Sequence, residues 1–168
     1  MIEKAMFWNI RSVNTQNSFG RLMDLNIRHH YSFIALMEPF QDPADIDQFK
    51  RKLGFDKALV NCSGKIWIFW RMEWEGEVVM NSIQQITMKF SKNNNIFFIS
   101  SVYARCNGVE RLELWDELSS CAEDIQSPWM VGGDFNVCLN EEEKLGGLAF
   151  TQQEAMDFAQ CISSCALL

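Results

Sequence analysis

Polar residues interrupt three apolar segments of the sequence, each near the point where the segment ends. Asn9 lies in AMFWNI and Glu38 ends FIALME, while Asp134 and Asn136 lie in VGGDFNV. In layered α/β proteins, sites gather where strands end and loops begin. A divalent cation such as Mg²⁺ prefers oxygen ligands, usually one or two carboxylates completed by phosphate and water. These residue types therefore suit metal-assisted phosphoryl transfer.

Each of these residues has a role that it could take in such chemistry. Glu38 can bind the cation. Asp134 can orient or deprotonate an attacking water, and Asn136 can donate a hydrogen bond to a phosphate oxygen or to the water. Gly132 and Gly133 would let the backbone approach a ligand closely.

Each feature also has a plain structural explanation when it is taken alone. A Glu at a strand end is commonly a solvated residue, and the string Gly-Asp-Phe-Asn is typical of a turn. Asn9 could cap the loop toward the first helix. From the residues alone, the sequence supports an α/β domain with a candidate phosphoesterase site.

The chain between these motifs predicts alternating strands and helices. Apolar runs predict strands at 5–10, 33–38 and 128–137, and helical spacing or polar patterning predicts helices near 17–30, 44–53 and 110–125. Five short apolar segments favour a β meander, at 57–61, 65–71, 76–80, 83–90 and 95–104.

Periodicity also assigns the faces of these helices. Ile27 and Leu112 fall on the faces expected to be buried. Thr151 and Glu154 form a T-x-x-E capping box, which predicts the start of a last helix. The order of elements is that of an α/β layered domain.

The combination of motifs resembles the endonuclease/exonuclease/phosphatase superfamily. A strand with W-N is followed after about 29 residues by a strand with M-E, and after about 96 more by G-G-D-F-N. The closest likeness is to endonuclease domains of plant non-LTR (LINE-type) retrotransposons, and it covers essentially the whole chain. SVYARCN, RLELWDEL and GGDFNVCLNEEEKLGG carry it.

This resemblance implies a layered β-sandwich flanked by helices. It implies that Glu38 and Asn9 contribute to metal binding, with Asn9 also ordering the phosphate. Tyr103 would lie beside the scissile phosphate, although it could equally be a core aromatic residue with its hydroxyl at the rim. Asp134 would align the nucleophile and Asn136 would stabilise the transition state.

The implied reaction is hydrolysis of a phosphodiester in DNA with Mg²⁺, or Mn²⁺, as the cofactor. In a retrotransposon, such a nick supplies a 3′-OH primer for reverse transcription. The alternatives are a catalytically dead remnant that binds at most a metal, nucleic acid or protein, and a small-molecule phosphoesterase.

The chain also departs from the family. Family members usually continue beyond a segment like ISSCALL into strands that carry a terminal Ser-Asp-His. His29 and His30 match no motif, and Pro39 and Phe40 replace the usual polar or basic residues after Glu38. The resemblance therefore implies a single domain over 1–168 that lacks its C-terminal part and is inactive by itself.

Loss of those strands would also affect stability. Trp67 and Phe69 are expected to lose the cover of the missing part of the second sheet and to become exposed. A truncated copy of this kind would have poor stability.

Charge is unevenly distributed along the 168 residues. The net charge is −7, yet residues 111–168 hold eleven acidic and two basic residues, so the preceding 110 residues total +2. The acidity is therefore no global argument against DNA, because it is regional and a bound cation would offset charge at the site.

Composition also bears on the compartment. No apolar run approaches the roughly 20 residues that span a bilayer, and no signal peptide begins the sequence. Six cysteines without a CxxC pair indicate reduced thiols and argue against a zinc site. The expected location is intracellular, and nuclear if the chain acts on DNA.

Overall fold

The apolar segments near residues 5–10 and 33–38 form neighbouring strands of a first sheet, sheet A. The computed structural model describes residues 4–144, 146 and 149–167. Strands β1 and β2 pair in parallel through the crossover helix α1 (Gln16–His29), and the other pairings are antiparallel. Sheet A has the order β1-β2-β4-β3, with strands Ala5–Asn9 (β1), Phe33–Met37 (β2), Ile66–Trp70 (β4) and Lys57–Val60 (β3).

A second sheet, sheet B, takes the rest of the strand-forming segments. It has the order β5-β6-β7-β8, with strands Glu75–Asn81 (β5), Gln85–Lys92 (β6), Asn95–Tyr103 (β7) and Trp129–Asp134 (β8). The β6–β7 hairpin turns at Asn93 and Asn94, which both adopt positive φ. The predicted single meander is therefore wrong in part, because β3 and β4 belong to sheet A while β5, β6 and β7 form a meander in sheet B.

The inner faces of the two sheets enclose an apolar core. Successive side chains of a strand point to opposite faces, so every second residue of these strands points into the core. Its buried residues come mainly from β2, β4, β6 and β7: Phe33, Ala35, Met37, Ile66, Ile68, Ile86, Met88, Phe90, Phe97 and Ile99. The predicted α/β layered sandwich is confirmed.

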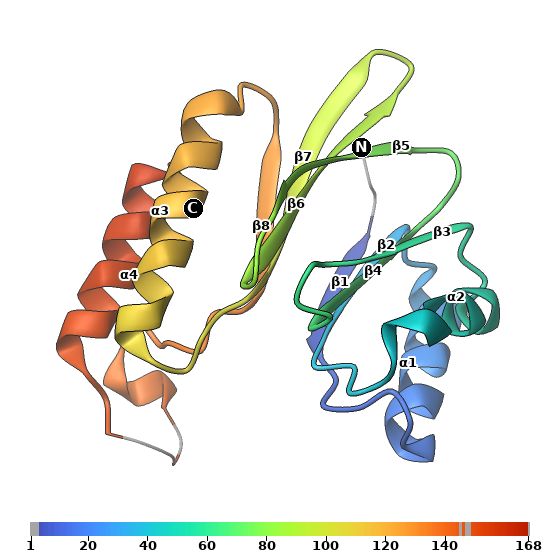
Figure 1. The fold of residues 1–168 in the computed structure, drawn as a ribbon, viewed down its shortest axis with the longest axis horizontal. Helices are drawn as coiled ribbons and strands as arrows, with labels where there is room; N and C mark the ends of the chain where they lie inside the picture. Colours follow the sequence, from blue (N-terminus) through green and yellow to red (C-terminus); the bar gives the residue numbers. More distant parts are fainter. Residues whose placement is uncertain (1–3, 145, 147–148, 168) are drawn as a thin grey trace. The chain divides into compact units, whose positions relative to one another are not determined.

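The outer face of sheet A is covered by α1 and by α2 (Ile46–Leu53), which follows a 3₁₀ turn, η1 (Pro43–Asp45) (Figure 1). Trp67 and Phe69 are fully buried there, in a cluster with Leu22 and Phe49. The expected exposure of these two side chains is therefore wrong. They point away from sheet B, so their cover comes from the helices.

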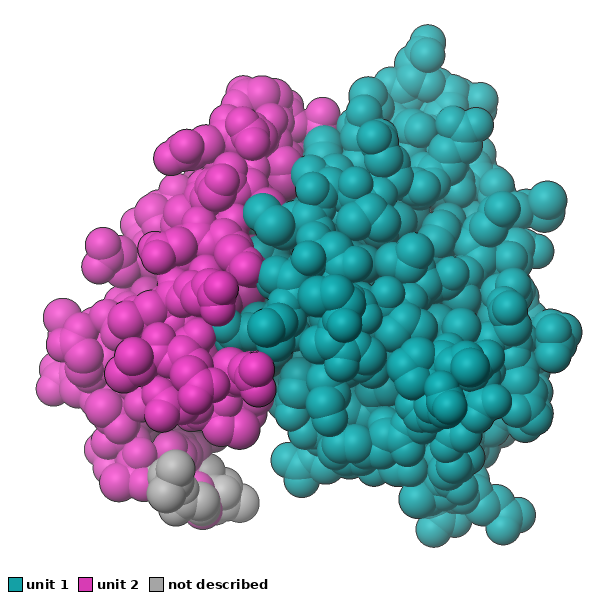
Figure 2. Space-filling view, in the orientation of Figure 1, with its two compact units in different colours: residues 1–103, 128–134 teal, residues 104–127, 135–168 magenta. Residues whose placement is uncertain are grey.

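Clustering of contacts divides the chain into two units, which Figure 2 colours separately. Unit 1 comprises Met1–Tyr103 and Pro128–Asp134, and so contains both sheets with α1 and α2. Unit 2 comprises Ala104–Ser127 and Phe135–Leu168. The single domain over 1–168 stays a prediction.

The described residues of unit 2 form two helices and a short 3₁₀ turn. They are α3 (Gly108–Asp124), η2 (Glu141–Glu143) and α4 (Gln152–Ser164). Rings of Trp115, Phe135 and Phe158 stack between the helices, with centroids 5.0–6.3 Å apart. These contacts give the Phe of GGDFN a packing role within the unit.

The predicted capping box at α4 does not form. Thr151 is the N-cap residue, but its side chain makes no cap hydrogen bond. Glu154 instead pairs with Arg111 of α3, whose fully buried guanidinium also donates to the carbonyl oxygens of Arg105 and Cys106. Leaving a buried guanidinium without a charged partner is more destabilising than leaving a helix end without this cap.

Two side chains expected on buried helix faces are exposed. Ile27 is 64% exposed on α1, where Asn26 is buried instead and donates to the carbonyl oxygen of Leu53 at 2.9 Å. Leu112 is 45% exposed on α3, where Leu114 is buried. The rest of each buried stripe holds, with Leu22 buried on α1 and Leu118 on α3. At the two exceptions a neighbouring polar side chain with hydrogen-bond partners, Asn26 or Arg111, takes the interior position.

The cysteines should differ sharply in reactivity. Burial, followed by the neighbouring Cys165, raises the pKa of the Cys161 thiol to about 12, whereas Cys106 is exposed. Because the thiolate is the nucleophile, we expect the folded chain at pH 8 to react with a thiol reagent at Cys62 and Cys106 and to spare Cys161 until it unfolds. Mass spectrometry of alkylated peptides measures this.

The raised pKa also sets a sign for the pH dependence of stability. The neutral Cys161 thiol contributes fully below about pH 8.5, the pKa of an unfolded thiol, and its contribution is lost as the pH rises toward 12. Fast alkylation of Cys161 in the folded chain at pH 8 would contradict this expectation.

Candidate active site

Four of the five residues predicted for the site lie in unit 1, at the carboxyl ends of strands. Asn9 ends β1 and Glu38 directly follows β2, and the strand pairing places Asn9 opposite Met37. In sheet B, Tyr103 ends β7 and Asp134 ends β8, and these two residues are paired in the β7–β8 register. We call Asn9, Glu38, Tyr103 and Asp134 the strand-end cluster.

One hydrogen bond of the cluster joins β1 to β8, and therefore sheet A to sheet B. The side-chain amide of Asn9 donates from Nδ2 to Oδ2 of Asp134 at 2.6 Å. The other amide oxygen, Oδ1 of Asn9, is buried and has no hydrogen-bond partner among the described residues. Buried polar atoms rarely go without a partner, so this oxygen is available to a ligand.

A second hydrogen bond joins β7 to the end of β2. The Tyr103 hydroxyl donates to Oε1 of Glu38, while its ring packs against the core between the sheets. The expectation of a core aromatic residue with its hydroxyl at the rim is therefore met, while the place of Tyr103 beside a scissile phosphate stays a prediction. The Glu38 side chain is only 18% exposed, with Arg11 Nε 3.9 Å from Oε2, so it is not the solvated residue of the alternative.

The two hydrogen bonds and the two strand pairings form a closed circuit. Asn9 bonds to Asp134, which is paired with Tyr103, which bonds to Glu38, which follows the partner of Asn9. Two carboxylates and one unpartnered amide oxygen are thus held together at one edge of unit 1.

Glu38 is held by its backbone as well. Its φ is +53°, a left-handed conformation that costs of order 1–3 kcal/mol for a residue other than glycine. Its N–H donates to the carbonyl oxygen of Lys65 at 3.0 Å, and its own carbonyl oxygen accepts from Ser12 N at 2.9 Å. Strain that is fixed from both sides in this way is typical of a functional position.

The loop after Glu38 carries the unusual Pro39 and Phe40. Phe40 also has a positive φ, of +46°, and its exposed ring lies 5.1 Å from Lys65 Nζ. An aromatic face and an ammonium group thus border the loop at the strand-end cluster.

The two glycines of GGD have packing reasons that the sequence did not reveal. A β-carbon added to Gly132 would lie 2.7 Å from the Phe7 ring, and one added to Gly133, whose φ is +144°, would lie 2.0 Å from the carbonyl oxygen of Val102. The sequence assigned both glycines to close approach of a ligand, whereas in the structure they allow close approach within the protein.

Asn136 belongs to unit 2. Its φ is +49°, and its Nδ2 donates to the carbonyl oxygen of Ala104 at 2.6 Å, so its side chain is fixed within that unit. The structure does not place it with the strand-end cluster, and its predicted contact with phosphate stays a prediction.

The histidines lie at the other end of sheet A. His29 ends α1 and His30 is its C-cap, three residues before β2 begins. Because β1 and β2 run in parallel, the start of β2 is opposite Ala5, whereas Asn9 and Glu38 stand at the far end of the same strands. Neither histidine is a member of the cluster.

The ligands that the strand-end cluster offers to a cation are all oxygen atoms. Among the residues that the structure describes, no three His, Cys, Asp or Glu side chains gather as a metal site. The cluster offers the carboxylates of Glu38 and Asp134 and the amide oxygen of Asn9. One or two carboxylates with neutral oxygens suit Mg²⁺ or Mn²⁺ and not a soft metal.

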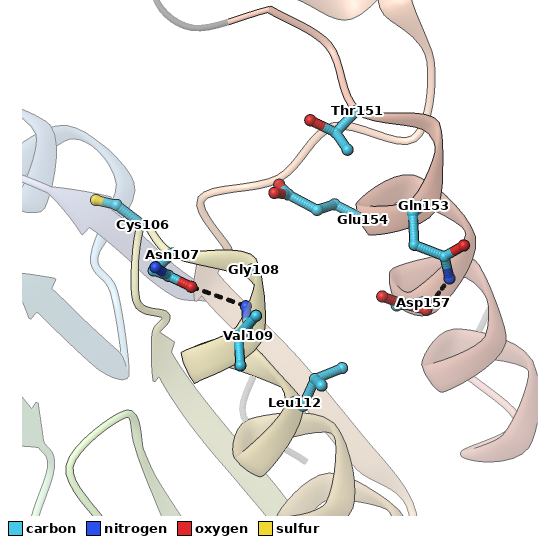
Figure 3. Close-up of a pocket in the computed structure, with 9 residues that line it drawn as sticks. All are labelled: Cys106, Asn107, Gly108, Val109, Leu112, Thr151, Gln153, Glu154 and Asp157. Atoms are coloured by element: carbon cyan, nitrogen blue, oxygen red, sulfur yellow. Dashed lines mark hydrogen bonds between the residues drawn. The ribbon is translucent and has the colours of Figure 1, made fainter.

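A separate hollow of about 660 Å³ lies in unit 2, where α3 and α4 begin (Figure 3). Its polar groups are partly paired already: Asn107 Oδ1 accepts from Val109 N, and Gln153 donates to Asp157. None of the residues predicted for the site lines it. The residues predicted for phosphoryl transfer therefore lie outside this hollow.

No family model matches the chain, and no curated protein sequence matches it. Solved structures do. An AP endonuclease from Archaeoglobus fulgidus superposes with a TM-score of 0.69 at 11% identity, covering 95% of this chain and 68% of that one. The endonuclease domain of TRAS1, a telomere-specific non-LTR retrotransposon, gives a TM-score of 0.62 at 10% identity, over 90% and 67% of the chains.

The chain has the endonuclease/exonuclease/phosphatase fold. TDP2 from Caenorhabditis elegans also shares it, with a TM-score of 0.60 at 13% identity over 86% of this chain. The chain spans about half the length of that protein, 50%. At such identities the likeness extends to the fold, and the activity requires its own argument. None of the described helices is long and apolar enough to cross a membrane.

Sequence reasoning missed two residues that shape the cluster. Arg11 lies 3.9 Å from the Glu38 carboxylate, and Phe7 packs on Gly132 beside the Asn9–Asp134 bond. The basic residue type of Arg11, two positions after Asn9, could have indicated its place beside Glu38. Nothing in the sequence indicated the second, because it depends on two edge strands from different sheets.

Proposed function

We propose that the strand-end cluster is the metal- and phosphate-binding part of a phosphodiesterase site that acts on DNA. The observation that carries this proposal is the closed circuit that holds Glu38 and Asp134 together and leaves Asn9 Oδ1 buried without a partner. Glu38 and Asn9 Oδ1 would hold Mg²⁺ or Mn²⁺, whose contribution is to neutralise charge on the phosphate.

Asp134 is the residue that aligns the nucleophile in this proposal. The amide of Asn9 fixes the orientation of its carboxylate through Oδ2. A carboxylate held in one orientation can accept the proton of an attacking water without the entropy cost of a mobile side chain. Tyr103, whose hydroxyl bonds Glu38, would lie beside the scissile phosphate.

The distribution of charge is compatible with DNA as the substrate. Unit 1 holds twelve basic and eleven acidic residues, whereas unit 2 holds three basic and eleven acidic residues, a net −8. Electrostatics favour contact of the phosphate backbone with unit 1, which carries the cluster. Nicking of a target to prime reverse transcription, as in a non-LTR retrotransposon, is the biological role that we propose for this activity.

Nicking of supercoiled plasmid tests the proposal. Nicking by this chain would overturn the inactivity that the resemblance implies. Where it occurs, we expect conversion to the open circle to need Mg²⁺ and to be lost in EDTA and in Asp134→Ala. Asp24→Ala, which removes an exposed carboxylate from α1, is the matched control and should nick like the unmodified chain. Nicking that survives Asp134→Ala, or that persists in EDTA, would refute the assignment.

A second candidate function is binding of metal and DNA without cleavage. The position of His29 and His30 at the opposite end of sheet A favours it, because neither can act as a general acid or base for the cluster. Fluorescence anisotropy of a labelled duplex with Mg²⁺ separates the two functions: binding that needs Glu38, with no nicking at any metal concentration, would support this one.

A further inference from the structure

A close contact between β1 and β8 lies directly beside the Asn9–Asp134 hydrogen bond. The Phe7 ring occupies the space where a side chain of residue 132 would begin, because a β-carbon there would lie 2.7 Å from Cδ2 and Cε2 and 2.9 Å from Cγ. Ordinary carbon contacts begin near 3.4 Å. The ring therefore rests on the bare backbone of Gly132.

The spacing along both strands makes this contact and the hydrogen bond adjacent. Phe7 and Asn9 are two residues apart in β1, and Gly132 and Asp134 are two residues apart in β8. Residues two apart in a strand lie on the same face. Phe7 on Gly132 and Asn9 on Asp134 are thus successive cross-links between the two sheets.

No described strand flanks β1 or β8 on its outer side. β1 is the first strand of sheet A and β8 the last of sheet B, so each has one neighbouring strand within its sheet. Each edge strand is hydrogen-bonded on one side only, so its spacing from the opposite sheet is set by side-chain contacts. The separation of these two strands at the site consequently depends on what lies between them.

The Phe7 ring is itself anchored. It packs against the core between the sheets and lies 5.9 Å from the ring of Phe33, with an angle of 51° between the planes. A β-carbon at position 132 would have to displace the ring or the strand by about 0.7 Å, since the core leaves the ring little room. If the strand moves, the 2.6 Å hydrogen bond of Asn9 would stretch to about 3.3 Å, beyond the usual limit of 3.2 Å.

We propose that Phe7 and Gly132 form a spacer that sets the β1–β8 separation, so that the Asn9 amide reaches Asp134. They are positioning residues for the site, and their effect on catalysis rests on the proposed function. Their effect on the Asn9–Asp134 hydrogen bond is independent of the proposed function.

Gly132 is a suitable position to probe, unlike its neighbour. Gly132 has no positive φ, so alanine fits its backbone and only the contact with Phe7 changes. Gly133 has a φ of +144° and would clash with the backbone itself. Gly76 of β5 offers a matched control, because its added β-carbon would meet Trp70, Met88 and Phe90 at 3.0–3.1 Å, in the same core but away from the cluster.

The test follows the side-chain amide signals of Asn9 by NMR, which are assigned by their loss in Asn9→Ala. We expect Gly132→Ala to shift the signal of the bonded proton upfield and to speed its exchange with water at least tenfold. Phe7→Leu alone should loosen the bond as well, because it leaves a gap. The double variant Phe7→Leu/Gly132→Ala should restore most of the protection, since the new methyl group fills the space that the ring vacates.

Activity is the second readout. If the chain nicks DNA, Gly132→Ala should lower kcat at least tenfold with little change in KM, the double variant should recover it, and Gly76→Ala should leave it unchanged. If no nicking is seen, the NMR measurements still test whether Phe7 and Gly132 act as a spacer. The proposed function and the spacer can therefore fail independently.

Two results would overturn the spacer. One is an unchanged Asn9 signal in Gly132→Ala. The other is a double variant that is no better than either single variant. If Gly132→Ala does not fold, the comparison of Phe7→Leu with the double variant gives the same decision.

Discussion

Replacing Gly133 with alanine should abolish the cooperative folding of unit 1. The φ of +144° is one that side chains rarely permit, and the new β-carbon would lie 2.0 Å from the carbonyl oxygen of Val102. That oxygen belongs to the paired residue of the neighbouring strand β7, so neither atom can move without breaking the β7–β8 pairing. Backbone strain and overpacking together should cost roughly 4 kcal/mol or more.

Thermal unfolding followed by circular dichroism measures this effect. Gly54→Ala is the matched control, because Gly54 also has a positive φ, +71°, but nothing lies within 4 Å of its added β-carbon. It should lower stability by only about 1 kcal/mol. If Gly133→Ala melts at the same temperature as Gly54→Ala, the clash with the Val102 carbonyl oxygen does not determine the need for glycine at position 133.

The ends of strands were predictable because their signals are local. An apolar run that stops at Glu38 or Asp134 marks both the strand and the edge at which its last side chain lies. Parallel pairing of β1 with β2, and of β7 with β8, then brings those ends together. Each half of the strand-end cluster follows from these two facts, whereas the joining of the halves depends on the packing of sheet A on sheet B. The resemblance added the role of each residue.

What covers each strand face was not predictable. Trp67 and Phe69 alternate with Ile66 and Ile68, and every one of them is buried. A strand that is apolar on both faces gives no sign of which face meets the helices and which meets the other sheet. The expected exposure failed at this point, because burial on the helical side does not depend on sheet B.

Ion pairs and backbone strain also escape a reading of local patterns. Glu154 has the spacing of a capping residue, yet it pairs with Arg111, 43 residues away. Glu38 adopts a left-handed conformation directly before Pro39, which no propensity favours. Both outcomes are decided by partners that are distant in the sequence, and tertiary contacts outweigh local preference there.

Glu38→Gln should weaken binding of Mn²⁺ at least ~100-fold, the upper end of what loss of a supporting residue costs. Glutamine keeps the shape of the side chain and an oxygen that can accept from Tyr103, so the fold and the hydrogen bond should survive. Only the negative charge is lost, and a divalent cation depends on it. Isothermal titration calorimetry with Mn²⁺ measures the affinity, and nicking should fall in parallel.

Two further variants make the result specific. Tyr103→Phe removes the hydroxyl that orients Glu38 while it leaves the carboxylate in place, so it should weaken Mn²⁺ binding only about tenfold. Glu77→Gln removes the charge of an exposed carboxylate on β5, which lies 3.8 Å from Lys89, and should have no effect. Equal affinities in Glu38→Gln and Glu77→Gln would mean that the cation binds elsewhere. We expect the loss of Mn²⁺ affinity to be largest in Glu38→Gln, smaller in Tyr103→Phe and absent in Glu77→Gln. This order arises only if the Glu38 carboxylate binds the metal and the Tyr103 hydroxyl positions that carboxylate, as the strand-end cluster suggests.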